Sequence, residues 1–219
     1  MRLLTALCVI GLCAFATARG WRIWQFAATR AQVIAHQIPA DAVRSWIGAP
    51  GLASAALYTL LTEAPATADR DASRRRTDAL AALLAVRPMS STDWLSLAGM
   101  RLVMGQPHQK VLAGLLMSSI TGPNEAAVMV QRAIFGLLQW KALPADARHR
   151  TIRDLAGAAR ADAIGDGAMA DAKNVLRTKS AETRAQIAGL LRAAQVPAAK
   201  LARMGLSVAP ADGGARQGS

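Results

Sequence analysis

Side chains that could carry out chemistry are scattered along this sequence and form no recognised motif. The three histidines are His36, His108 and His149, and none is followed by a metal ligand three or four positions further on. Ser90 and Ser91, with Asp93, could belong to a nucleophilic site, but no histidine lies near them in the sequence. Helix capping accounts for all three residues.

The acidic residues give no stronger signal for a site. Asp162, Asp166 and Asp171 lack the spacing and the terminal glutamate of a calcium loop, and they fit a polar bend. Neither a phosphate-binding P-loop nor a GxGxxG motif occurs. We therefore expect no catalytic residue, no metal and no cofactor, so that the protein is not an enzyme. The rival prediction is an accessory subunit of a hydrolase or transferase that uses scattered polar residues.

Arginine gives the chain its formal charge of +12, and two clusters stand out. The candidate anion contacts are Arg74, Arg75, Arg76, Arg148, Arg150 and Arg153. Such clusters suit anionic lipid headgroups or an acidic polysaccharide. The alternative is that they solvate helix faces, since aspartates are interleaved with the first cluster. Aromatic residues are not interleaved with either, so we expect no nucleic-acid partner.

The composition predicts the class of fold that must position these side chains. Of the 219 residues, 53% are hydrophobic but only 4% are aromatic, and most of the apolar residues are Ala, Leu, Val and Met. All of these except Val favour helix, while the aromatic and β-branched residues typical of strands are scarce. An all-α chain follows, long enough for one domain with appendages.

The N-terminus begins with an apolar run from Leu3 to Ala18 that ends in an Ala-x-Ala triplet. Such a triplet is typical of a cleaved signal peptide. Interfacial aromatic and basic residues follow it, however, as they do in an uncleaved membrane anchor. They are Arg19, Trp21, Arg22, Trp24 and Phe26. We expect an anchor, with the lipid bilayer as a partner.

The orientation of this anchor is a separate question. Arg2 and the amino terminus precede the apolar run, and Arg19, Arg22 and Arg30 follow it, so the positive-inside count favours a cytoplasmic C-terminal part. A short apolar run that ends in Ala-x-Ala is nevertheless typical of exported bacterial proteins. We therefore expect one span in a bacterial inner membrane with a periplasmic C-terminal domain.

Proline and glycine divide the remainder into short segments, each with apolar residues at helical spacing. The predicted domains are a signal-anchor and interfacial helix at 1–36, a linker at 37–51, a repeat domain at 52–160, capping helices at 161–205 and a disordered tail at 206–219. The predicted helices of the repeat domain are 52–64, 69–86, 91–104, 108–120, 124–141 and 145–160. Those beyond it are 168–178, 181–194 and 198–204. Asp69, Ser91 and Asn124 are the candidate N-caps.

A shift of 35 residues superimposes the third helix of the repeat domain on the fifth. Leu95 then falls on Val130, Ala98 on Ala133 and Leu102 on Leu137. A helix–turn–helix period close to this length is typical of α-solenoids, in which stacked helical hairpins bury one another's apolar faces. The pair at 52–86 does not share the register, so the predicted repeat is degenerate.

The stretch from Trp94 to Pro123 resembles a tetratricopeptide repeat. Trp94, Leu97 and Ala98 match that family's first helix, whereas Arg101 and Lys110 depart from it. The resemblance implies a scaffold that binds a protein partner.

A second, weaker resemblance is to uncharacterised membrane-associated proteins encoded with surface-polysaccharide genes in rhizobia-like bacteria. It covers Trp94, Gly105–Pro107, Lys110–Leu112 and Thr121–Glu125. It implies an envelope or surface-polysaccharide assembly as the setting. The alternative function is direct binding of anionic lipid or acidic polysaccharide through the basic clusters.

Overall fold

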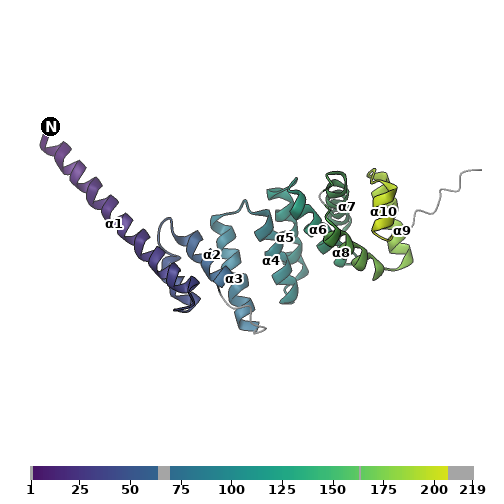
Figure 1. The fold of residues 1–219 in the computed structure, drawn as a ribbon, viewed down its shortest axis with the longest axis horizontal. Helices are drawn as coiled ribbons and strands as arrows, with labels where there is room; N and C mark the ends of the chain where they lie inside the picture. The colour runs from purple at the N-terminus through teal and green to yellow at the C-terminus, as the bar shows by residue number, and fades with distance from the viewer. Residues whose placement is uncertain (1, 64–69, 163, 207–219) are drawn as a thin grey trace, which may run out of the picture. The chain divides into compact units, whose positions relative to one another are not determined.

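The computed structural model describes residues 2–63, 70–162 and 164–206, and in these ranges every regular element is a helix (Figure 1). The all-α prediction is confirmed. The helices are α1 (Arg2–Ile34), the 3₁₀ helix η1 (Ala40–Trp46), α2 (Ala53–Glu63), α3 (Arg70–Val86), α4 (Ser91–Val103), α5 (His108–Thr121), α6 (Ala126–Leu138), α7 (Ala145–Arg160), α8 (Asp166–Arg177), α9 (Ala181–Ala193) and α10 (Ala198–Arg203). The candidate N-cap Asp69 and the tail from 207 onward lie outside the described residues.

The chain divides into two compact units, and the predicted domain boundaries stay predictions. Unit 1 comprises residues 1–89 and 100–107, and unit 2 comprises residues 90–99 and 108–219. In unit 1, η1 packs against α1 and α2, and α2 packs against α3. The shared core of α1, η1 and α2 holds Phe26, Val33, Val43, Ala56 and Leu60.

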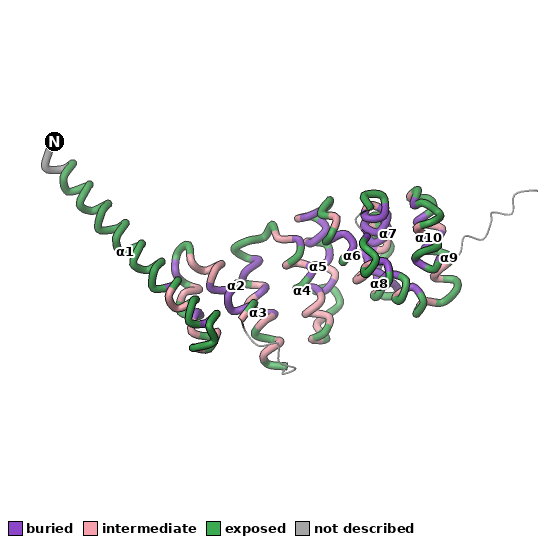
Figure 2. Tube along the Cα trace, viewed as in Figure 1, coloured by how far each residue is buried: buried purple, intermediate pink, exposed green. Residues whose placement is uncertain are grey.

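Unit 2 is built around contacts among α6, α7, α8, α9 and α10. Helix α6 packs against α7 and α8, α7 also packs against α9, and α9 packs against α10. The main apolar core runs through these helices and includes Leu137, Trp140, Leu155, Ile187 and Leu201, all almost fully buried (Figure 2). Stacking of the hairpins into a solenoid stays a prediction.

Several helices end by a shared hydrogen-bonding pattern that explains their boundaries. After α1, His36 adopts φ of 55°, and the amide of Gln37 donates to the carbonyl of Gln32 at 2.9 Å. After α4, Gly105 adopts φ of 65°, and Gln106 donates to Arg101 at 2.9 Å. This left-handed cap satisfies carbonyls that have no partner inside the helix.

Two of the N-cap predictions were wrong. Ser91 is the first residue of α4, and the Ser90 hydroxyl accepts the amide of Asp93 at 3.3 Å. Ser91 instead donates to the carboxylate of Glu125, so its hydroxyl serves a contact with another segment. Helix α6 begins at Ala126, and Glu125 rather than Asn124 is its N-cap residue.

Candidate functional site

The predicted interfacial residues of α1 lie on two different faces of the helix. Trp21 and Trp24 are exposed and stack on each other, with ring centroids 4.9 Å apart. Helical spacing places Arg19, Arg22 and Phe26 on the opposite face, since residues three, four and seven apart share a face. Trp21 and Trp24 therefore present aromatic surface away from the rest of unit 1.

Phe26 differs from the other predicted interfacial residues because it is buried inside the protein. It is only 5% exposed, and its ring meets that of Trp46 edge to face at 5.7 Å. Val33, two turns further along the same face, is also buried in this core. Phe26 thus joins α1 to η1 and α2, and it is not available to lipid as Trp21 and Trp24 are.

The first basic cluster remains open to solvent. Arg74 and Arg75 are exposed and Arg76 is half-buried, while Thr77 and Leu80 on the opposite face of α3 are buried. This arrangement leaves the guanidinium group of Arg74 accessible to an anion.

The second basic cluster is mostly engaged within unit 2. Arg148 donates to the carbonyls of Trp140 and Lys141 at 3.0 and 3.3 Å, and its guanidinium lies 5.7 Å from the Trp140 ring. Arg150 pairs with Asp146, and this hydrogen bond lowers the pKa of that carboxyl below its usual 3.8. Arg153 is exposed. The three side chains therefore do not converge on a common anion site.

A buried ion pair that the sequence analysis missed lies at the centre of unit 2. Arg132 is 1% exposed and Asp154 is 2% exposed. The guanidinium binds the carboxylate through two contacts, Nε to Oδ2 at 2.8 Å and Nη2 to Oδ1 at 3.2 Å. Arg132 is in α6 and Asp154 in α7, so the pair fixes the register of these two helices.

The same guanidinium also holds the C-terminal end of α5. Its Nη1 donates to the carbonyls of Ser118 and Gly122, each at 3.0 Å. The Ser118 carbonyl, in the last turn of α5, also accepts the amide of Gly122 at 3.2 Å, and the Gly122 carbonyl lies just beyond the helix end. Arg132 therefore connects α5, α6 and α7 through charge-assisted hydrogen bonds, which are stronger than neutral ones.

The histidines lie in separate elements, as their sequence spacing predicted. His36 is in the turn after α1, and His149 is exposed on α7. His108 begins α5, and its Nε2 lies 3.0 Å from the carbonyl oxygen of Ala142. Within the described ranges, no three residues among His, Cys, Asp and Glu are grouped to hold a metal ion.

Two members of the acidic run connect α10 to the turn after α7 and to the first residue of α8. Asp162 pairs with Lys200 at 2.8 Å, and Asp166 pairs with Arg203 at 2.6 Å. The hydrogen bond from Lys200 lowers the pKa of Asp162 below its usual 3.8. A lowered carboxyl pKa favours the folded state at neutral pH, and this contribution disappears as the pH falls through the folded-state pKa. These aspartates have a structural role in holding the C-terminal helix.

Comparisons of the chain with protein-family models, with curated proteins and with solved structures each found no match. In the absence of a match, the class of protein is defined by its structure alone. It is an all-helical protein with one N-terminal helix, α1, that is long and apolar enough to span a membrane.

Proposed function

We propose that this protein is a membrane-tethered helical-repeat scaffold that binds a protein partner in a bacterial envelope or surface-polysaccharide assembly. The observation that carries the proposal is the uncovered stretch of α1. Residues 5–25 are exposed throughout, and burial begins at Phe26 (Figure 2). At about 1.5 Å per residue, the part of α1 from Arg2 to Ala18 covers about 25 Å, close to the thickness of a hydrocarbon core, so that Arg19 to Trp24 reach the headgroup layer.

The contacts within unit 2 support helical hairpins as the repeating element. Ser91 reaches Glu125, and His108 reaches Ala142; both hydrogen bonds join residues 34 positions apart. Helix α6 packs against α8 and α7 against α9, as expected when successive hairpins stack. Stacked hairpins commonly present extended protein-binding surfaces, so this support is by analogy of fold.

The membrane tether is proposed as an uncleaved anchor in a bacterial inner membrane, with the helical units on the periplasmic side. A signal peptide would also be apolar and N-terminal. An anchor is favoured because α1 continues without a break past Ala18 and is packed into unit 1 through Phe26 and Val33. Confinement to a membrane would raise the effective concentration of the scaffold near a membrane partner.

Direct binding of anionic lipid or acidic polysaccharide is the second candidate function. The exposed Arg74 on α3 favours it. The internal contacts of Arg148 and Arg150 weigh against the second cluster, because binding an anion there would break hydrogen bonds that unit 2 already uses.

A crosslinking experiment with charge-neutralised variants separates these two functions. The full-length protein is crosslinked in native membranes and purified beside an Arg74→Gln/Arg75→Gln/Arg153→Gln variant. All three arginines are exposed, so we expect the variant to fold normally. We expect one and the same protein partner, at stoichiometric yield, with both forms.

A second variant tests whether an exposed apolar surface contributes to binding of that partner. Leu116 and Ile120 are exposed one turn apart on α5, and Leu116→Gln/Ile120→Gln removes this surface without altering charge. Failure to recover any protein partner with the unmodified protein contradicts the scaffold proposal. Loss of bound lipid or glycan in the arginine variant alone would support the second candidate.

A further inference from the structure

The turn at residues 47–52 lies beside Arg19 of α1, about two helical turns before burial begins at Phe26. A Cβ placed on Gly51 would be 3.5 Å from Nη2 of Arg19, so this arginine extends along the turn. Arg19 shares its helix face with Phe26 and Val33, which pack into the core of unit 1. The turn therefore has a fixed position along α1.

The direction of α2 fixes which part of unit 1 is nearest the exposed stretch. Helix α2 begins at Ala53, directly after the turn, and its Ala56 and Leu60 join Phe26 and Val33 in one cluster. Gly51 lies beside Arg19, whereas the later residues Ala56 and Leu60 cluster with Phe26 and Val33, so α2 leads away from Arg19. Its C-terminal end at Glu63 is about 16 Å further along than its start.

The chemistry around this turn suits the boundary between lipid headgroups and acyl chains. Ile47, Pro50 and Leu52 are apolar and partly or fully exposed. The neighbouring face of α1 carries Arg19 and Arg22, and residues 1–40 contain no acidic side chain. Guanidinium groups pair with phosphate in a bidentate manner, so this face is complementary to anionic headgroups.

We propose that residues 47–52, together with Arg19 and Arg22, form a membrane-contact surface that rests on the phospholipid headgroup layer. The stacked Trp21 and Trp24 lie at the same depth on the other face of α1, where interfacial aromatics are expected. This inference rests on the proposed membrane span. It adds that unit 1 is held against the bilayer in one orientation, with α2 pointing away from it.

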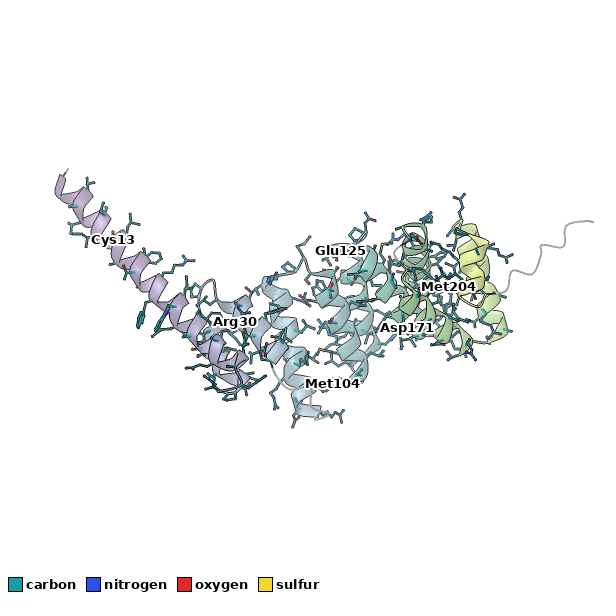
Figure 3. The ribbon with its side chains drawn as sticks, in the orientation of Figure 1. Cys13, Arg30, Met104, Glu125, Asp171 and Met204 are labelled. Carbon is teal, nitrogen blue, oxygen red and sulfur yellow. The ribbon has the colours of Figure 1, made fainter. Side chains whose placement is uncertain are left out.

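Fluorescence quenching in phospholipid vesicles measures the depth of each position in the full chain. Cys8 and Cys13 are both exposed on α1, and Figure 3 labels Cys13 on its uncovered stretch. A Cys8→Ser variant leaves Cys13 to carry a nitrobenzoxadiazole fluorophore. Pro50→Cys and the control Thr62→Cys are each made with both native cysteines changed to serine. Nitroxide lipids carry the quencher either at the headgroup or within the acyl chain.

We expect the acyl-chain nitroxide to quench the label at Cys13. The headgroup nitroxide should quench the label at Pro50→Cys at least about twofold more than the label at Thr62→Cys, because Thr62 lies about 14 Å along α2 from its start. Equal quenching at positions 50 and 62 would overturn the membrane-contact surface while leaving the span intact. An unquenched label at Cys13 would overturn the span itself, and the surface with it.

Discussion

Replacing Arg132 with methionine is expected to lower the free energy of unfolding by about 3–5 kcal/mol, because it leaves a carboxylate buried without its partner. Asp154 is 2% exposed and receives two hydrogen bonds from Arg132. The carbonyls of Ser118 and Gly122 lose a charged donor in the same substitution. Urea unfolding followed by circular dichroism measures the change.

Two further variants isolate the buried charge as the cause. Arg132→Met/Asp154→Leu removes both charges, and it should recover much of the lost stability, since apolar replacements of buried pairs are often neutral. Arg153→Met changes an exposed arginine of α7 and should cost less than about 0.5 kcal/mol. A double variant no more stable than Arg132→Met alone would contradict this explanation.

Gly136→Ala is expected to destabilise the protein by about 1–3 kcal/mol, because α6 and α7 approach each other closely at this glycine. An added Cβ would clash with Oγ1 of Thr151 and would lie 2.7 Å from its Cγ2. Thr151 is buried, and its hydroxyl donates to the carbonyl of Ala147, so it has little room to move. Thermal unfolding monitored by circular dichroism measures the loss.

Gly189→Ala in α9 provides the matched control for this substitution. Nothing lies within 4 Å of a Cβ placed at Gly189, so alanine there should stabilise the helix by up to about 1 kcal/mol. Adding Thr151→Ala to Gly136→Ala should restore part of the loss, since the two closest atoms disappear. If Gly136→Ala and Gly189→Ala behave alike, helix propensity rather than packing governs both positions.

Most helix boundaries followed from local signals in the sequence. The predictions 91–104 and 145–160 correspond to α4 at Ser91–Val103 and α7 at Ala145–Arg160. The prediction for α6 ran to residue 141, whereas the helix ends at Leu138. No breaker marks this end. The chain turns there because Trp140 is buried in the core. Arg148 donates a hydrogen bond to the carbonyl of Trp140.

The buried ion pair could not be found by local reasoning, because its partners are 22 residues apart. A charged helical residue is usually assigned to the solvent face. One signal was nevertheless present. Arg132 occupies the apolar face of α6 beside Ala133 and Gly136, and Asp154 occupies the apolar face of α7 beside Leu155. Opposite charges at core positions of consecutive helices predict such a pair.

The candidate site was predictable only for residues whose environment depends on their spacing along one helix. Trp21 and Trp24 are exposed on α1, as an interfacial role requires. The second basic cluster depended on distant contacts: Arg148 binds backbone carbonyls of the turn after α6, and a sequence cluster does not reveal such partners. Phe26 likewise packs against Trp46, twenty residues away.

The central claim is that α1 remains attached and spans a membrane. Alkaline carbonate extraction of cell membranes, followed by intact-mass measurement of the full-length protein, tests it most directly. We predict that the protein stays in the membrane pellet and that its mass includes residues 2–18. Release of the protein into the supernatant, with the mass of a polypeptide that begins at Arg19, would contradict the claim.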